Sequence, residues 1–426
     1  MAMTDFAIIR RSLMARLPST IVTVVMVAIG VALVLVLMSM RNAGQRAFER
    51  GPGTMHMLVS RDDSSLVAVL NGIFYANPPR RPIAWQEYLE YADGPFEYAI
   101  PVQQGDSYAG FPVLATLPTF FSQFQPSYEE PWNFVEGQSF ERAYQVVVGA
   151  KVASVTGLEV GDIIVLTHGV PGSANNVDGM EPHVHDEYKY EIVGVLGATG
   201  GPHDRALFTH LEGSWVIHAH DRRRMIDPSI TETTVDDLED VDRLITGIYI
   251  RVQTRGGAVL SGMQQAVFDG FRSDTTITVA DPGQEIQGLF NIIGHIDGIL
   301  LAMAIIVLFS SGAGILLALY NSMAERRGQI AVLRVLGCTS GRICGLVMTE
   351  SAVIGMIGGV VGVVIAFFGG VLVAGELRDR LQLVVEPTVP LDIALVVVVA
   401  TIFLAALAGL GPALMAYRTD VGRNLD

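Results

Sequence analysis

The sequence predicts an α-helical membrane protein with four transmembrane helices and a large α+β extracytoplasmic domain inserted between the first and the second. Half of the 426 residues are hydrophobic and the mean hydropathy is +0.42. The apolar residues gather in four long runs rather than spreading through the chain, which is typical of an integral membrane protein. Residues 41–290 contain 17 basic and 33 acidic residues, a net charge of −16 against −15 for the whole chain. An acidic domain of this size argues against nucleic acid as a partner.

The first two segments of the chain predict a retained membrane anchor. Residues 1–20 carry Arg10, Arg11 and Arg16 and form an amphipathic lead-in at the cytoplasmic surface. Residues 21–40 are almost wholly apolar and have the length that a bilayer core requires, so they form the first transmembrane helix. A cleaved signal peptide is the alternative, but its apolar stretch spans only about 7–15 residues and ends in a small-residue cleavage site, which residues 38–41 lack.

Residues 41–287 have the pattern of an extracytoplasmic α+β domain. The segment QVVVGAKVASVTGLEVGDIIVLTHG, residues 145–169, predicts a strand over 146–148, a helix over 150–156, a turn at Gly157 and a strand over 162–167. Further strands are expected at 188–196, 247–252 and 275–279, and a helix at 258–271. Strands interleaved with short helices favour a mixed α+β domain.

The rest of the chain reads as three more spans with short connections. Residues 288–320 form the second transmembrane helix, entered by a helix that starts near Pro282. They are followed by a basic cytoplasmic loop with a short helix (321–342), the third transmembrane helix (343–374), a short extracytoplasmic loop (375–390), the fourth transmembrane helix (391–414) and a cytoplasmic tail (415–426). The arginines of 321–342 and of the tail place both on the cytoplasmic side.

The segment from Glu325 to Ile343 carries the pattern E-R-R-x-x-I-x-x-L-R-x-L-G-x-T-x-x-x-I. It resembles the signature of ABC-transporter permeases of the FtsX/MacB class, the type VII or mechanotransmission family. The strand, helix and strand of residues 145–169 also resemble the periplasmic core domain of MacB-type permeases. The resemblance implies that 321–342 contains a coupling helix that binds in a groove of an ATPase. The residues expected to contact the ATPase are Glu325, Arg326, Arg327, Leu333, Arg334, Gly337 and Thr339.

No P-loop motif G-x-x-x-x-G-K-[ST] occurs, so the ATPase is expected on a separate polypeptide that carries the ATP and magnesium. We find no catalytic motif and expect no catalysis from this chain. The resemblance implies a permease subunit with two copies of a cytoplasmic ATPase and either a second copy or a paralogous permease, in the inner membrane of a bacterium with both termini cytoplasmic. A periplasmic adaptor or substrate-binding protein is a further expected partner.

The resemblance leaves two functions open. The first is export or extraction of a peptide, lipoprotein, small molecule or metal-linked ligand, driven by conformational change of the periplasmic domain. The second, typical of the FtsX branch, is regulation of a periplasmic cell-wall hydrolase or sensor without transport.

Four glycines of the third span predict close helix packing. Gly355 with Gly359, and Gly358 with Gly362, are spaced four apart and give one helix face a smooth stripe. Packing within one subunit and dimerisation are both compatible with this stripe.

Seven of the nine histidines fall between His168 and His220. His183 with His185, and His218 with His220, form H-x-H pairs, which on an extended chain project to the same face and can bind one Zn²⁺. The alternative is a polar loop whose histidines make ordinary hydrogen bonds. An aromatic cluster between Phe120 and Phe134 is expected either in the domain core or around a groove for an apolar ligand.

Overall fold

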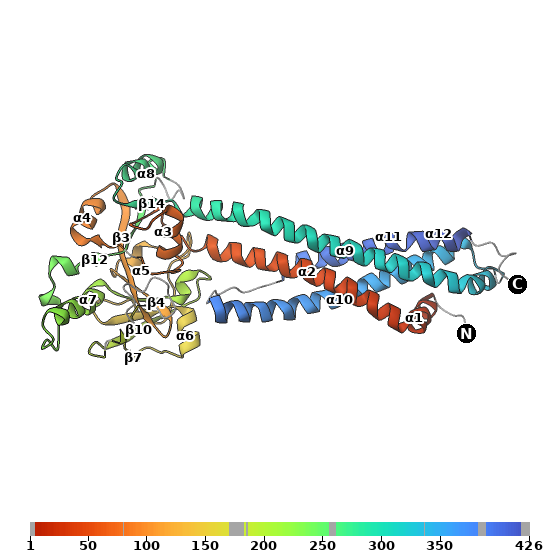
Figure 1. Ribbon diagram of the computed structural model, residues 1–426, viewed down its shortest axis with the longest axis horizontal. Helices are drawn as coiled ribbons and strands as arrows, with labels where there is room; N and C mark the ends of the chain where they lie inside the picture. The colour runs from red at the N-terminus through yellow and green to blue at the C-terminus, as the bar shows by residue number, and fades with distance from the viewer. Residues whose placement is uncertain are drawn as a thin grey trace. The chain divides into compact units, whose positions relative to one another are not determined.

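The computed structural model describes residues 5–79, 81–169, 183–184, 186–254, 261–335, 337–381 and 389–418, and it gives the backbone alone at 6, 47, 183, 293, 296–297, 322–334, 374–381 and 416–418. The chain divides into two compact units. We call residues 1–45 with 292–426 the helical unit, and residues 46–291 the α+β unit. Figure 1 labels the helices and some of the strands of both units.

The helical unit is built from α1 Asp5–Ala15, α2 Leu17–Glu49, α9 Pro282–Val335, α10 Ser340–Leu381, α11 Leu391–Ala408 and α12 Leu410–Arg418. Four stretches of these helices are long and apolar enough to cross a membrane, as predicted. They are Leu17–Arg46, Gly298–Asn321, Ser340–Val373 and Leu391–Met415. The α+β domain lies between the first and second of them in sequence, which confirms the fold class.

Prolines lie in the first turns of α2 and α9, where they do not interrupt the helix. Pro18 lies in the first turn of α2, where a proline costs no helical hydrogen bond. Before α9, a side-chain oxygen of Asp281 accepts a hydrogen bond from the backbone N–H of Gln284 at 3.1 Å, and Pro282 takes the first helical position. The helix predicted to start near Pro282 is thus confirmed.

The main difference from expectation concerns α9. A separate short helix was expected within residues 321–342, but α9 continues to Val335 as one helix of 54 residues. No proline interrupts residues 321–335, so the helix of the second span has no reason to stop there. Likewise α10 continues to Leu381, into the stretch expected to be a loop.

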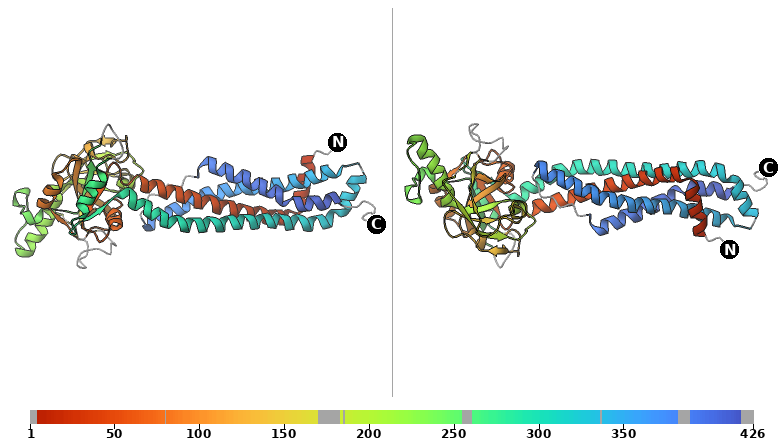
Figure 2. Two further views of the ribbon diagram at one scale, coloured as in Figure 1. Left: turned by 90° about the horizontal axis from the view of Figure 1, so that it is seen from above. Right: turned by 90° about the horizontal axis from the view of Figure 1, so that it is seen from below.

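The long helices of the helical unit run side by side in both views of Figure 2, and the unit has its own apolar core. Buried residues from four helices pack together, among them Val31 of α2, Ile315 of α9, Ile354 of α10 and Ala405 of α11. The helices expected to span the membrane therefore pack against one another within a single chain.

The α+β unit contains a 12-stranded sheet with the order β14-β1-β13-β3-β4-β11-β6-β10-β5, to which β7, β8 and β9 are added at β10 and β3. A second sheet pairs β12 with β2. Only the pairs β4–β11 and β6–β10 are parallel among the described ladders. The strands are β1 Met57–Ser60, β2 Ile83–Ala84, β3 Phe96–Tyr108, β4 Phe111–Thr116, β5 Phe134–Gly137, β6 Gln145–Val148, β7 Ile163–Ile164, β8 Thr167–His168, β9 His183–Val184, β10 Tyr190–Leu196, β11 Leu207–His210, β12 Leu244–Ile245, β13 Gly247–Val252 and β14 Thr278–Ala280.

Short helices cover both faces of this sheet. They are α3 Ser65–Gly72, α4 Trp85–Ala92, α5 Phe120–Gln123, α6 Ala150–Thr156, α7 Leu211–Ile226 and α8 Gln264–Arg272, with 3₁₀ turns η2 Pro202–Arg205, η3 Val235–Asp237 and η4 Asp240–Asp242. Side chains alternate along each strand, so Leu58 packs with α3 and α5 on one face, while Met57 and Val59 pack with α4 and α7 on the other. All six residues of β13 are buried, as expected for a strand that is covered on both faces.

The predicted unit of residues 145–169 is confirmed in its first half. β6, α6 and the left-handed Gly157 (φ +73°) follow in the expected order. The single strand expected over 162–167 is instead two short strands, because β7 pairs with β10 whereas β8 pairs with β3. This change of partner brings residue 168 beside β3.

Candidate functional site

The turn between α9 and α10 is the position at which the family resemblance expects contact with an ATPase. Gly337 has φ +90°, a left-handed conformation that favours glycine and ends the helical path. Thr339 precedes α10, and its hydroxyl accepts a hydrogen bond from the backbone N–H of Arg342 at 3.4 Å. Both Gly337 and Thr339 are exposed. The turn is therefore a tight, accessible connection between two long helices.

The other residues expected to contact the ATPase belong to the last turns of α9. Their backbone is helical, and their side chains lie outside the described part of the structure; they are Glu325, Arg326, Arg327, Leu333 and Arg334. Their contacts with a partner stay a prediction.

Helix α1 contacts the beginning of α10 at two points. A side-chain oxygen of Asp5 lies 2.6 Å from the guanidinium of Arg342. Ser12 donates a hydrogen bond of 2.5 Å from its hydroxyl to the buried carboxyl of Glu350. The ion pair is exposed, so solvent screens it and it contributes little to stability. The Glu350 contact matters more, because a buried carboxyl needs hydrogen-bond partners.

The glycine stripe of α10 contacts two neighbouring helices of the same chain. A Cβ atom at Gly355 would lie 2.5 Å from the Cβ of Ala405 in α11, and Gly359 also faces α11. A Cβ atom at Gly362 would lie 2.7 Å from the Cβ of Val31 in α2, and Gly358 also faces α2. The stripe thus serves close approach within one subunit.

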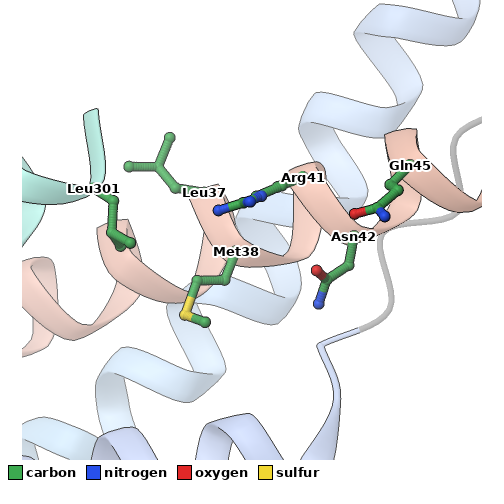
Figure 3. Close-up of a pocket in the computed structure, with 6 residues that line it drawn as sticks. All are labelled: Leu37, Met38, Arg41, Asn42, Gln45 and Leu301. Carbon is green, nitrogen blue, oxygen red and sulfur yellow. The ribbon is translucent and has the colours of Figure 1, made fainter. Parts of the chain in front are cut away.

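A cavity of about 160 Å³ lies beside α2 in the helical unit (Figure 3). Its lining combines apolar and polar side chains from successive turns of α2 with one residue of α9: Leu37, Met38, Arg41, Asn42, Gln45 and Leu301. Ligand pockets usually measure about 300–1,000 Å³, so this cavity is smaller than the usual site for a small-molecule ligand.

The aromatic cluster mostly forms the core of the α+β unit. Phe120 and Phe124 are fully buried, and the indole N–H of Trp132 donates to the carbonyl of Phe124 at 2.8 Å. Tyr128 differs, since it lines an open hollow of about 560 Å³ together with residues of α8 and the start of α9. Of the two alternatives, the core is confirmed for Phe120, Phe124 and Trp132.

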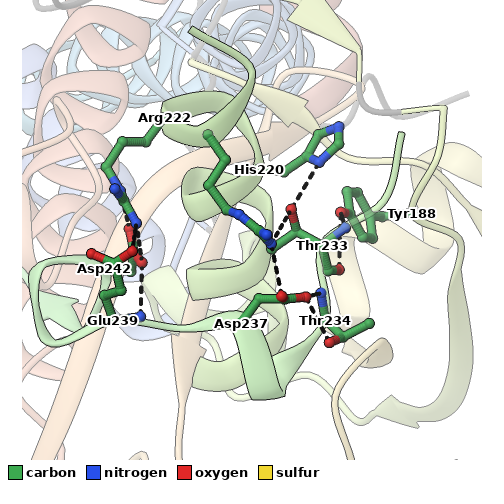
Figure 4. Close-up of polar contacts among 9 residues, drawn as sticks. Tyr188, His220, Arg222, Thr233, Thr234, Asp237, Glu239 and Asp242 are labelled. Carbon is green, nitrogen blue, oxygen red and sulfur yellow. Dashed lines mark hydrogen bonds and ion pairs between the residues drawn. The ribbon is translucent and has the colours of Figure 1, made fainter. Parts of the chain in front are cut away.

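The pair His218 and His220 does not lie on an extended chain, and that part of the zinc hypothesis is wrong. Both residues belong to α7, where side chains two positions apart point to nearly opposite sides. The Nδ1 atom of His220 lies 3.1 Å from the hydroxyl of Thr233, in the polar network of Figure 4. His220 is buried there, away from His218.

The second histidine pair is only partly described. His183 lies in β9, where its backbone pairs with that of His168 in β8; its side chain and the whole of His185 lie outside the described residues. Two more of the seven histidines between 168 and 220, His203 and His210, make contacts that stabilise the fold. Burial lowers the pKa of His203 to about 4, and its Nδ1 lies 2.7 Å from the hydroxyl of Tyr75. His210 caps α7 by accepting from the N–H of Glu212.

The structure does bring two histidines together with a carboxylate that the sequence did not indicate. One side-chain oxygen of Asp106, Oδ1, lies 3.2 Å from Nδ1 of His168 and 3.2 Å from Nε2 of His218. The two imidazole rings meet edge to face, with centroids 4.9 Å apart. We call these three side chains the Asp106 cluster.

Three separate elements form the Asp106 cluster. Asp106 lies where the register between β3 and β4 shifts, after Gln104 and before Ser107, which is typical of a β-bulge. There β3 takes β8 as a partner, and Asp106 pairs directly with His168. Helix α7 supplies His218. Asp106 is 62 residues from His168 and 112 residues from His218 in the sequence, so no local motif could predict the cluster.

Asp106 is held as a carboxylate. Burial alone would raise the pKa of Asp106, but the charge of His218 and the hydrogen bonds of both histidines outweigh burial and hold this pKa well below its usual range. The hydrogen bond with Asp106 raises the pKa of His168 in turn. The cluster is therefore a buried negative charge faced by two imidazoles.

Two family models match the chain over most of its length. The model described as FtsX-like permease C-terminal matches residues 301–421, and the MacB-like periplasmic core domain matches residues 20–267. The first contains the spans from α9 to α12, and the second contains most of the α+β unit.

Two curated relatives carry matching names. An uncharacterized ABC transporter permease of Methanocaldococcus jannaschii is 21% identical over 248 residues, 57% of this chain and 57% of that protein. An uncharacterized ABC transporter permease protein of Mycobacterium tuberculosis is 26% identical over 352 residues, 78% of this chain and 36% of that protein. The chain thus spans 57% and 36% of the lengths of these relatives. By its two family models and these relatives, the chain belongs to the FtsX/MacB-like permeases of ABC transporters.

Proposed function

We propose that this chain is the transmembrane subunit of an ABC system, in which a separate cytoplasmic ATPase drives conformational change of the α+β unit and thereby export or extraction of a substrate. The family implies a partner ATPase. In this proposal two ATPase copies act on two permease chains in a bacterial inner membrane. The α+β unit is periplasmic and both termini are cytoplasmic.

Charge supports this orientation. Arg10, Arg11 and Arg16 precede the first span, and residues 321–342 contain four more arginines. Cytoplasmic loops of membrane proteins carry an excess of Lys and Arg. The acidic α+β unit then belongs on the opposite side.

The observation that carries the proposal is the continuity of α9. This helix contains 54 residues, whereas about 20 suffice to cross a bilayer, and it ends two residues before Gly337. Because one helix contributes residues to both units, a displacement applied at its Val335 end can be transmitted along its length. Contact between the ATPase and the α9–α10 turn would apply that displacement.

The first experiment is purification of the full chain in mild detergent from its host, followed by an ATPase assay of the copurified proteins. A P-loop ATPase whose activity depends on this chain is the expected result. Copurification of a periplasmic adaptor with it would favour export, and copurification of a cell-wall hydrolase would favour FtsX-like regulation. Absence of any ATPase would contradict the proposal.

Charge reversal at Arg334 tests the contact surface. We expect Arg334→Glu to reduce the copurified ATPase by about tenfold, equivalent to about 1.4 kcal/mol of binding, without unfolding the chain. Arg272→Glu is the matched control, because Arg272 also lies in the last turn of a helix, α8, and loses the same interaction with the helix dipole. Equal ATPase recovery from the two variants would refute the assigned surface.

A further inference from the structure

We propose that Asp106, His168 and His218 bind a divalent transition-metal ion, with Zn²⁺ as the expected occupant. The three ligand atoms lie within 4.8 Å of one another, and Asp106 Oδ1 is 3.2 Å from each histidine nitrogen. A tetrahedral zinc ion with bonds of about 2.0–2.1 Å separates neighbouring ligand atoms by about 3.3 Å. The two separations between Asp106 and the histidines therefore already match those of a zinc site.

The chemical types of the three ligands indicate which class of metal ion the site would bind. Two imidazoles and one carboxylate suit zinc and its neighbours in the first transition row, whereas magnesium and calcium prefer oxygen ligands throughout. Three protein ligands leave the fourth position of a tetrahedral ion for water or another group. The site is accessible, because the side chains of His168 and His218 are 37% and 27% exposed while that of Asp106 is 3% exposed.

The side chains behind the ligands hold them in position for an ion. The Ser214 hydroxyl donates to Asp106 Oδ2 at 3.1 Å, which leaves Oδ1 facing the histidines. The side-chain amide of Gln103 lies 3.0 Å from Nδ1 of His218. Metal-binding histidines usually bond through their second ring nitrogen to such a group, which fixes the tautomer.

The amide of Gln103 can set the tautomer of His218 when an ion binds. The oxygen and nitrogen of a side-chain amide are exchangeable in assignment. In the metal-bound state the Gln103 oxygen would accept a hydrogen bond from Nδ1–H of His218. The lone pair of His218 Nε2 would then bind the ion, which replaces the hydrogen bond between His218 and Asp106.

Metal binding would join three distant parts of the chain. Asp106, His168 and His218 come from β3, β8 and α7, so the unfolded chain does not hold the ligands together. An ion that binds the folded state alone stabilises it by mass action. A rise in thermal stability with added zinc is therefore expected together with binding.

The test uses the full-length chain in detergent after removal of metals with a chelator. Titration with Co²⁺ should give one ion per chain and the visible absorption of a four-coordinate Co²⁺ site, and Zn²⁺ should displace it and raise the melting temperature. His168→Ala, His218→Ala and Asp106→Asn should each weaken binding by more than about 100-fold, and Gln103→Ala by about 10- to 100-fold. Asp106→Asn keeps the shape of the buried side chain, so it remains informative if an alanine variant fails to fold.

The matched control is His220→Ala, which removes a histidine from the same helix but not from the cluster. This variant should bind Co²⁺ as the unaltered chain does. The proposal is overturned if the unaltered chain binds no Co²⁺ or Zn²⁺ up to about 100 µM, since a three-ligand protein site should bind more tightly. It is also overturned if binding persists in His168→Ala and His218→Ala.

Discussion

At the scale of single residues, Asp242 makes a bidentate, buried contact with an arginine in the α+β unit. Its two oxygens accept hydrogen bonds from Arg222 at 2.7 and 2.8 Å, and the N–H of Glu239 donates to Asp242 Oδ2 at 3.0 Å (Figure 4). The side chain of Asp242 is only 3% exposed. Burial raises the pKa of Asp242, but the hydrogen bonds from Arg222 and Glu239 outweigh it, so the pKa lies below its usual value.

We expect Asp242→Asn to lower the free energy of unfolding at pH 7 by about 1–3 kcal/mol, because it removes a charge-assisted pair. A depressed native pKa contributes stability above the unfolded-state pKa, about 3.9, and this stability is lost as pH falls toward the native pKa. The difference between the two proteins should therefore shrink below about pH 4, as measured by thermal melts across a pH series.

Asp63→Asn supplies the comparison for this variant. Asp63 also pairs with an arginine, Arg81, but its side chain is 87% exposed, so its loss should cost about 0–1 kcal/mol. If both variants lost the same free energy of unfolding, the buried bidentate pair of Asp242 would stabilise the protein no more than the exposed pair of Asp63, and the prediction would be wrong.

At the scale of elements, the packing of α10 depends on glycine. Gly362→Ala would place a Cβ 2.7 Å from the Cβ of Val31 and 2.8 Å from the carbonyl of Ala28 in α2. Since overpacking of this kind typically costs about 1–3 kcal/mol, we expect a lower melting temperature in detergent. Gly345→Ala in the same helix is the control, because its Cβ would meet nothing within 4 Å and alanine favours a helix. Equal melting temperatures would show that α2 and α10 need no close contact.

The sequence predicts local elements better than the contacts between them. The four spans, the start of α9 at Pro282 and the order of β6 and α6 follow from apolar runs, caps and turns, which act within a few residues. The Asp106 cluster depends on β3 changing partner at a bulge, and no local pattern encodes that change. The zinc hypothesis for His218 and His220 is wrong because the H-x-H pattern does not distinguish a strand from a helix. Side chains two positions apart share one face of a strand but point to nearly opposite sides of a helix such as α7.

At the scale of the whole molecule, each apolar cluster contains residues of one unit only. Among the described residues, three apolar clusters contain only residues of 46–291, and the two clusters of the helical unit contain none of them. A unit with its own core and a sheet covered on both faces has what an independent domain requires. We therefore expect a fragment of residues 46–291 to fold alone, with a single cooperative thermal transition followed by circular dichroism.

We expect the stability of that fragment to depend on its last residues, which form the first turns of α9. Ile286 is 5% exposed and packs in the core, Phe290 lies edge to face against Phe48 at 5.5 Å, and Ser65 donates to Glu285 at 2.7 Å. A fragment that stops at residue 280 loses all of these contacts, and the loss of Ile286 alone should cost about 1.5–3 kcal/mol. Ile286→Ala in the longer fragment isolates that share from the effect of truncation. A shorter fragment as stable as the longer one would mean that the first turns of α9 contribute nothing to the α+β unit, and an insoluble or non-cooperative longer fragment would contradict its independence.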